Sequence, residues 1–272
     1  MPASETLRSR ANPLYKRLRA LKQKGTAGGL CLLEGPKLTR EAISAGLTIV
    51  EAAASPRAET TPAGAMALAE LRERGVPVRR MAEALLASLS DTTTSQGIVA
   101  LAERPAFAPE LLFRGTPLVL VIDGVQDPGN LGALLRSAEA AGASGALVTK
   151  GSADPLSWKA LRGSMGSALR LPHVAGLSID EALARLEAHA VAVYATAADG
   201  DRRYDEADLR GPAAVVVGRE GAGLSAAVQQ RATARLCIPL AAPVESLNVG
   251  VAAALVLFEA SRQRGFAARP GS

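Results

Sequence analysis

The sequence predicts an α/β protein in which a small N-terminal α/β domain precedes a larger domain built on a mostly parallel sheet. Three observations lead to this prediction. From residue 117 onward, continuous apolar runs alternate with stretches of helical periodicity, as in a parallel sheet that is covered on both faces. The N-terminal part shows a shorter alternation of the same kind. Between them, residues 104–117 contain three prolines and are typical of a linker. We therefore expect domains at 1–104 and 117–272 and a linker at 105–116.

The N-terminal domain begins with a predicted basic amphipathic helix. Residues 12–23 place Leu14, Leu18 and Leu21 at helical spacing, and the cations lie at other positions. The runs that follow predict strands at 29–35, 47–53, 76–81 and 97–103 and helices at 36–45 and 62–74.

Five apolar runs predict the strands of the second domain. They lie at 117–124, 145–149, 190–196, 212–218 and 235–240, with helical patterns between them at about 131–141, 155–165, 179–188, 224–231 and 248–264. Ligands of such sheets bind beyond the carboxyl ends of the strands, so we expect the site in the loops there.

Composition excludes several classes of protein. The longest apolar run, Val249 to Phe258, has ten residues, whereas a membrane span needs about 20. The N-terminus carries charge without an apolar stretch behind it, so we expect a cytoplasmic protein with no membrane partner. Cys31 and Cys237 have no Cys or His neighbours at ligand spacing, which predicts neither a metal site nor a disulfide.

Positive charge is concentrated at the N-terminus. Residues 1–40 contain nine Lys or Arg and two acids, a net charge of +7 against +5 for the whole chain. Such a segment suits binding to a phosphate backbone, although a solvated basic helix would show the same composition. The candidate RNA-binding residues are Arg10, Lys16, Arg17, Arg19, Lys22 and Lys37.

Three motifs fall where the sheet argument places a site. In the first (121–142), Asn130 is a natural N-cap, and Arg136 projects away from the buried stripe of the helix, as a catalytic residue or as a solvated charge. In the second (214–225), glycines follow a buried strand, and Glu220 is either a functional carboxylate or a surface acid.

The third motif (237–260) contains Ser246 and Asn248 directly before a nearly all-apolar helix. Either residue could simply be an N-cap. A helix that is apolar all round must be buried in the core or against another subunit.

One segment allows a different function. Residues 221–226 (GAGLSA) fit the dinucleotide fingerprint, which keeps a nicotinamide-dependent oxidoreductase as an alternative. The context argues against it, because the next strand is followed by no acid until Glu245.

Taken in order, the three motifs resemble those of the SpoU/TrmH family of SPOUT RNA methyltransferases. The likeness lies in DPGNLGALLRSAEAAG, VVVGREGAGLS and IPLAAPVESLNVGVAAALVLFE, and residues 157–174 are similar to the connecting segment of the family. NPLYKRLRAL and LLEGPKLTREAISAGL resemble the small RNA-binding domain, akin to certain ribosomal proteins, that many members carry. The resemblance implies a C-terminal trefoil knot and a homodimer formed through the C-terminal domain.

The resemblance also implies a function: methylation of a ribose 2′-hydroxyl in structured RNA with S-adenosylmethionine as cofactor. The separate N-terminal domain favours ribosomal RNA as partner over transfer RNA, and a non-catalytic RNA-binding protein remains an alternative. The cofactor pocket implied by the motifs consists of Thr196, Ala197, Gly218, Ile238, Leu240, Leu247 and Asn248.

The resemblance assigns activation of the hydroxyl to Arg136, with Asn130 steering this residue and Glu220, Ser246 and Asn248 around it. Because a guanidinium stays protonated in proteins, we interpret Arg136 as holding a phosphate beside the target and stabilising the developing alkoxide. Two residues depart from the family pattern: Gly250 replaces a serine, and Ala242 stands where glycine is common. Both changes are small, so we expect a preserved pocket.

Overall fold

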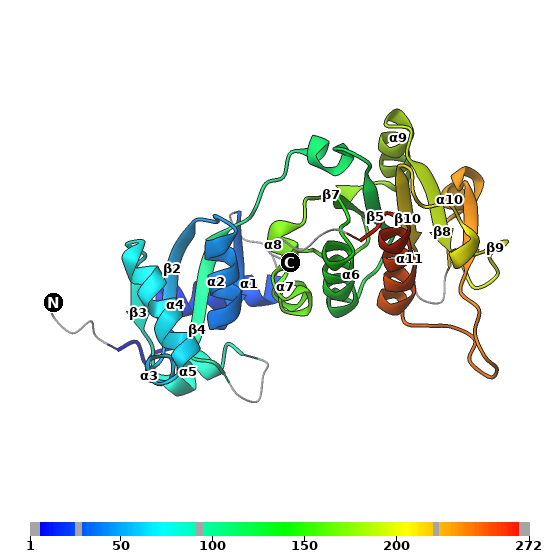
Figure 1. Ribbon diagram of the computed structural model, residues 1–272. Helices are drawn as coiled ribbons and strands as arrows, with labels where there is room; N and C mark the ends of the chain where they lie inside the picture. The colour runs from blue at the N-terminus through cyan, green and yellow to red at the C-terminus, as the bar shows by residue number, and fades with distance from the viewer. Residues whose placement is uncertain (1–5, 25–28, 91–94, 220–222, 267–272) are drawn as a thin grey trace. The chain divides into compact units, whose positions relative to one another are not determined.

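The computed structural model describes residues 6–24, 29–90, 95–219 and 223–266 (Figure 1). The chain forms two compact units. Unit 1 contains the chain up to Ala106 together with Leu156–Leu169, and unit 2 contains Phe107–Pro155 and the chain from Arg170 onward. The chain therefore passes from unit 1 to unit 2, returns to unit 1 and leaves it again.

Unit 1 is a four-stranded sheet in the order β1-β4-β2-β3, in which β4 is antiparallel to both neighbours and β2 and β3 are parallel. The predicted strands and longer helices are present, but two one-turn helices, α3 and α5, were not predicted because five residues are too few to show a period. The elements are α1 (Pro13–Lys24), β1 (Leu30–Glu34), α2 (Pro36–Ser44), β2 (Ile49–Ala54), α3 (Pro56–Thr60), α4 (Pro62–Glu73), β3 (Val78–Arg80), α5 (Glu83–Ala87), β4 (Ile98–Glu103) and α7 (Trp158–Ser164).

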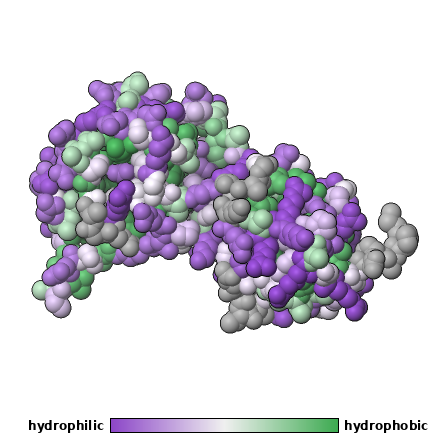
Figure 2. Space-filling model, turned by 180° about the vertical axis from the view of Figure 1, so that it is seen from behind, coloured by the Kyte–Doolittle hydropathy of each residue, from purple (hydrophilic) through white to green (hydrophobic). Residues whose placement is uncertain are grey.

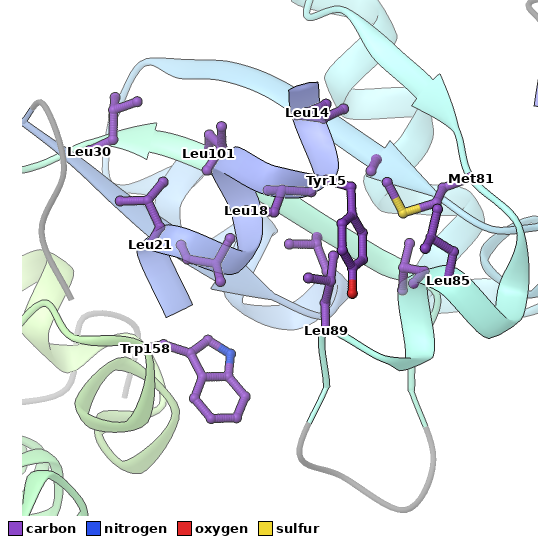
Figure 3. Packing of buried hydrophobic residues seen from close by; sticks show 14 residues of the cluster. Leu14, Tyr15, Leu18, Leu21, Leu30, Met81, Leu85, Leu89, Leu101 and Trp158 are labelled. Atoms are coloured by element: carbon purple, nitrogen blue, oxygen red, sulfur yellow. The ribbon is translucent and has the colours of Figure 1, made fainter. Parts of the chain in front are cut away.

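The core of unit 1 is completed by a side chain from far along the chain. Leu14, Leu18 and Leu21 of α1 are buried as predicted, and Trp158 of α7 packs into the same cluster (Figure 3). The cationic ends of Lys22 and Arg162 lie 4.6 and 4.9 Å from the centroid of the Trp158 ring. Two cation–π contacts therefore add to the packing of this buried indole.

Unit 2 is a seven-stranded, entirely parallel sheet in the order β7-β6-β5-β10-β8-β11-β9. The five predicted strands are confirmed. The two edge strands, β7 and β9, were missed, because β7 contains the exposed residues Ala175 and Gly176 and β9 has only two residues. The strands are β5 (Leu118–Ile122), β6 (Gly145–Thr149), β7 (His173–Leu177), β8 (Ala192–Thr196), β9 (Arg202–Arg203), β10 (Ala213–Val217) and β11 (Ala234–Cys237).

Helices cover both faces of this sheet. In Figure 1, α6 and α11 lie side by side on one face. On the other face, Val119, Val121 and Val216 share a core cluster with residues of α9 and α10. Because β5 and β10 are buried along their whole length, their sequences are continuously apolar instead of alternating. The helices and 3-10 helices of this part are η1 (Pro109–Phe113), α6 (Pro128–Ala140), α9 (Ile179–Ala188), η2 (Tyr204–Glu206), α10 (Ala226–Arg231) and α11 (Val249–Gln263).

The helix predicted at 155–165 is present as α7, and a short helix that was not predicted, α8 (Ser167–Arg170), follows it after a break. Met165 and Gly166 have φ values of 51° and 95°, and the left-handed backbone at these residues ends α7. Within the described parts of the chain, every helix is too short or too polar to cross a membrane.

Arg264 joins the end of α11 to the start of the sheet. Its guanidinium donates hydrogen bonds to the carbonyl oxygens of Leu209 (2.8 Å), Thr116 (3.1 Å) and Pro117 (3.3 Å), and also to that of Gly211. Burial lowers the pKa of Arg264 below its usual value. The charge is thus stabilised by carbonyl dipoles instead of a carboxylate.

We expect Arg264→Ala to lower the free energy of unfolding by about 2 kcal/mol, because several half-buried carbonyl groups lose their donor. Urea unfolding measures this change. The control is Arg210→Ala, since Arg210 forms an exposed ion pair with Asp208 (side chains 72% and 62% exposed), and its loss should leave the free energy of unfolding nearly unchanged. Equal losses in the two variants would contradict the structural role of Arg264.

Candidate active site

A pocket of about 300 Å³ lies at the carboxyl edge of the seven-stranded sheet. It is formed by the loops that follow β8, β10 and β11 and by the first turns of α11. This is the edge at which the sequence predicted a site, because parallel strands present their carboxyl ends together. The pocket is lined by Thr196, Ala197, Ala198, Gly218, Arg219, Gly223, Leu236, Ile238, Leu240, Glu245, Ser246, Leu247, Val249 and Ala252.

The structure brings most of the predicted cofactor residues together in this pocket. Six of the seven line it, and the seventh, Asn248, lies between the lining residues Leu247 and Val249. Ser246, predicted as catalytic, also lines the pocket. The lining is mostly small and apolar, which leaves backbone groups accessible to a ligand. Figure 2 shows the opposite side of the molecule from Figure 1, where the loop between β11 and α11 projects from unit 2.

The loop after β10 folds tightly on itself. A Cβ atom on Gly218 would lie 2.6 Å from the carbonyl oxygen of Gly223, so only glycine fits at residue 218. Arg219 and Gly223 form a β-bridge, and Gly223 has a φ of +67°. The predicted catalytic residue Glu220 lies outside the described residues.

The first and third motifs meet through a pair of asparagines. The Asn248 side-chain amide donates to Oδ1 of Asn130 (3.1 Å), although the two residues are 118 positions apart. Asn248 Oδ1 accepts from the backbone N–H of Gly250 (2.9 Å) and caps α11, as the sequence allowed. A single side chain therefore starts one helix and fixes the orientation of the Asn130 amide.

The N-cap of α6 is Asp127, so the prediction of Asn130 as N-cap was wrong. The Asp127 carboxylate accepts from the Asn130 backbone N–H (2.7 Å). Pro128 explains the shift, because its fixed φ and missing N–H suit the first position of a helix. Asn130 thus lies inside the first turn, where its side chain contacts Asn248.

Arg136 is exposed on α6, and Leu131, Leu134, Leu135 and Ala138 are buried on the opposite side, as predicted. No ion pair or hydrogen bond of the Arg136 guanidinium occurs among the described residues. The charge is available to an anion outside the protein.

Sequence reasoning missed two charged residues of the pocket, Arg219 and Glu245. Both adjoin residues that the motifs did single out, Glu220 and Ser246. Their position next to motif residues was the one signal in the sequence that could have identified them as pocket residues. Periodicity does not give the direction of a side chain in a loop.

Most of the predicted RNA-binding cations lie exposed on unit 1. Lys16, Arg17 and Arg19 project from α1, and the part of the chain that the structure describes offers these three no ion-pair partner. Arg10 and Lys37 are exposed as well. Hydrophilic side chains dominate the visible face of unit 1 in Figure 2.

Other cations of unit 1 are neutralised within the protein. The ion pairs are Arg40 with Glu70, Arg79 with Glu51 and Arg80 with Glu59. Lys22, predicted to bind RNA, is half-buried with its ammonium over the Trp158 ring. This position gives Lys22 a packing role that the sequence did not indicate.

An apolar groove runs along α6 and α11, separate from the pocket. Its lining includes Ala133, Val251, Leu255, Phe258 and Phe266. Three of these side chains are strongly exposed: Val251 (48%), Phe258 (43%) and Phe266 (58%). The apolar helix predicted from the third motif therefore buries one side in unit 2 and leaves an apolar side uncovered, which is typical of an interaction surface.

Among the described residues, no group of three or more His, Cys, Asp or Glu side chains could hold a metal ion. The polar side chains of the site are amides, the hydroxyls of Thr196 and Ser246, guanidinium groups and the carboxylate of Glu245.

Comparison with known families covers both parts of the chain. Residues 117–258 match the SpoU rRNA Methylase family, and residues 12–100 match the MRM3-like substrate binding domain.

Relatives of known name and structure are similar along most of the chain. An uncharacterized tRNA/rRNA methyltransferase of Synechocystis sp. is 36% identical over 98% of this chain and 97% of its own length. The 23S rRNA (guanosine-2′-O-)-methyltransferase RlmB of Ralstonia nicotianae is 39% identical over 66% of this chain and 74% of its own length. The crystal structure of the SpoU methyltransferase AviRb from Streptomyces viridochromogenes with the cofactor AdoMet is 30% identical, covers 93% of this chain and 98% of its own, and has a TM-score of 0.83.

We expect Asn248→Ala to lower the free energy of unfolding by about 1 kcal/mol, because it removes both the cap of α11 and the contact with Asn130. Asn248→Asp keeps an acceptor for the Gly250 N–H and should cost less than half as much, although it loses the donor to Asn130. Thermal and urea unfolding measure both variants. Equal destabilisation would show that the cap is not the stabilising contact.

Proposed function

Because the chain belongs to the SpoU rRNA methylase family, we propose that it transfers the methyl group of S-adenosylmethionine to a ribose 2′-hydroxyl of ribosomal RNA. The observation that carries this proposal is the family match over residues 117–258, the same segment that builds the pocket and the Asn130–Asn248 pair. Ribosomal RNA is favoured over transfer RNA because RlmB is named for 23S rRNA and because residues 12–100 match a substrate binding domain. Such a substrate also favours a cytoplasmic location.

The pocket fits S-adenosylmethionine. Its volume lies in the range of small-molecule sites, and its glycines and small apolar side chains let an adenine and a ribose approach backbone hydrogen-bonding groups. Bound there, the cofactor supplies a methyl group already activated by the sulfonium. We assign its binding to the residues that the motifs indicated: Thr196, Ala197, Gly218, Ile238, Leu240, Leu247 and Asn248.

The protein's own task is to position a ribose oxygen and to stabilise the charge that develops on it. Arg136 is exposed and unpaired among the described residues, and a guanidinium presents paired N–H donors to a phosphate, so Arg136 holds the phosphate beside the target. It also stabilises the alkoxide that develops as the hydroxyl gives up its proton to water or a neighbouring group. Asn130, held by Asn248, orients the groups around Arg136. Ser246 adds a hydroxyl from the wall of the pocket, and Glu220 remains assigned to the site by its motif.

Binding of the RNA uses unit 1. The exposed cations of α1, together with Arg10 and Lys37, have the charge that a phosphate backbone requires, whereas Arg40, Arg79 and Arg80 are paired with glutamates.

We also propose that unit 2 contains a trefoil knot. The resemblance of the three motifs supports this, and the strand order is compatible with it, because β10 lies between β5 and β8, which both precede it in the chain. The chain therefore returns to the middle of the sheet after it has formed the strands on both sides, β5 and β8.

The function is tested with the purified protein, S-adenosylmethionine labelled at the methyl group, and transcripts of 23S rRNA and of tRNA. We expect label in the 23S rRNA, located by mass spectrometry on a ribose. Arg136→Ala should lower turnover by roughly 100-fold or more and leave the affinity for S-adenosylmethionine within about twofold of the wild type.

If neither the 23S rRNA nor the tRNA became labelled, the result would contradict the proposed function. Equal losses of turnover and of cofactor affinity in Arg136→Ala would contradict the role of Arg136 while leaving the function in place.

We propose, further, that the protein is a homodimer formed through the groove on α6 and α11. Exposure of this apolar side of α11 to water is unfavourable, and Phe258 alone is 43% exposed. A second copy of the chain carries the same apolar surface and can cover it.

Phe258→Glu should convert the dimer to a monomer in light scattering coupled to size-exclusion chromatography. Met66→Glu is the matched control, because Met66 is 50% exposed on unit 1 and should leave the mass unchanged. A wild-type monomer would overturn this proposal.

A further inference from the structure

Arg219 is a charged residue of the second motif that the proposed mechanism does not use. Its backbone is fixed, because its carbonyl oxygen accepts from the Gly223 N–H (3.3 Å) and Gly218, on its other side, packs against Gly223. The side chain is exposed at its outer end. The backbone from which the Arg219 side chain extends is therefore held in place at the edge of the pocket.

The side chain lies across the loops that follow the two neighbouring strands. A Cβ atom built on Gly124, just after β5, would be 2.4 Å from Arg219 Nε and 2.9 Å from its Cγ. One built on Gly151, after β6, would be 3.5 Å from Nη2. Because Gly124 has no Cβ atom, the Arg219 side chain can occupy this space, and the φ of +73° at Gly124 also favours glycine.

This path leads away from most of the pocket. In the sheet order β6-β5-β10-β8-β11, the Arg219 side chain runs from β10 over β5 towards β6, whereas the other walls of the pocket follow β8 and β11. The loop after β5 is also the one that leads into α6, which carries Asn130 and Arg136. Arg219 therefore borders the pocket on the side of the proposed catalytic groups.

The charge of Arg219 has no carboxylate partner among the described residues. Asp123, which precedes Gly124, instead accepts a hydrogen bond from the Thr149 hydroxyl (2.8 Å). A guanidinium that has no carboxylate partner attracts an anionic ligand. Planar guanidinium groups bind phosphate oxygens with two parallel hydrogen bonds.

We propose that Arg219 binds a backbone phosphate of the RNA strand that enters the active site over the β5 and β6 loops. The proposal rests on the proposed function and assigns Arg219 as a positioning residue, because phosphate contacts set the register of a nucleic acid on a protein. The phosphate contact of Arg219 is additional to that of Arg136 and to those of the α1 cations.

The test compares Arg219→Gln and Arg219→Lys with a matched control, Arg114→Gln. Arg114 is exposed in unit 2, has no ion pair among the described residues, and lies near the amino end of β5, at the opposite edge of the sheet. Filter binding to a 23S rRNA transcript is measured over a range of salt concentrations. Calorimetric titration gives the affinity for S-adenosylmethionine, and steady-state kinetics gives kcat and the KM for RNA.

For Arg219→Gln we expect RNA binding about tenfold weaker, with a slope of log affinity against log salt smaller by about 0.7 to 0.9, as for one lost phosphate contact. The KM for RNA should rise by a larger factor than the change in kcat or in the affinity for S-adenosylmethionine. Arg219→Lys should keep most of the slope, and Arg114→Gln should match the wild type.

Two results would overturn the assignment. RNA affinity and slope could be unchanged in Arg219→Gln, or cofactor affinity could fall while RNA binding is intact, which would identify the cofactor carboxylate as the partner. RNA binding is measured without turnover, so a wild-type protein that binds the transcript but transfers no methyl group would contradict the proposed function alone.

Discussion

Parallel pairing of all seven strands in unit 2 is the constraint on which the site depends. Because every strand runs in the same direction, the loops after β5, β8, β10 and β11 emerge at one edge, although they are spread over more than a hundred residues. Burial of β5 and β10 on both faces fixes these strands, and the asparagine pair and the bridge between Arg219 and Gly223 then fix the loops. The positions of the proposed catalytic groups follow from backbone topology more than from any single contact.

Much of this arrangement could be predicted from the sequence, for identifiable reasons. Strands such as β5 and β10 are buried along their whole length, so their apolar runs stand out, and the edge argument placed the pocket correctly. The edge strands β7 and β9 lack that signal because one is partly exposed and the other has two residues. The individual pocket residues came from resemblance to a family, since periodicity carries no information about loops.

The failures concern side chains whose partners are distant in the sequence. Asn130 looked like an N-cap because its residue type fits, but Pro128 and Asp127 start the helix and leave Asn130 to Asn248. Lys22 belonged to a basic segment, yet its position over the Trp158 ring depends on a residue 136 positions later. Arg219 was passed over because Glu220 beside it carried the motif. The segment GAGLSA, which suggested a nucleotide-binding oxidoreductase, is part of the second motif of the family to which the chain belongs.

The contribution of Trp158 to the core of unit 1 has a consequence for synthesis of the chain. The last strand of this unit ends at Glu103, but its core stays open until the ribosome has added the 55 residues up to Trp158. At translation rates of about 5 to 20 residues per second, the interval is roughly 3 to 11 s. During that time the leucines of α1 lack this neighbour in their cluster, and the strands β5 and β6 are made before unit 1 can complete its core.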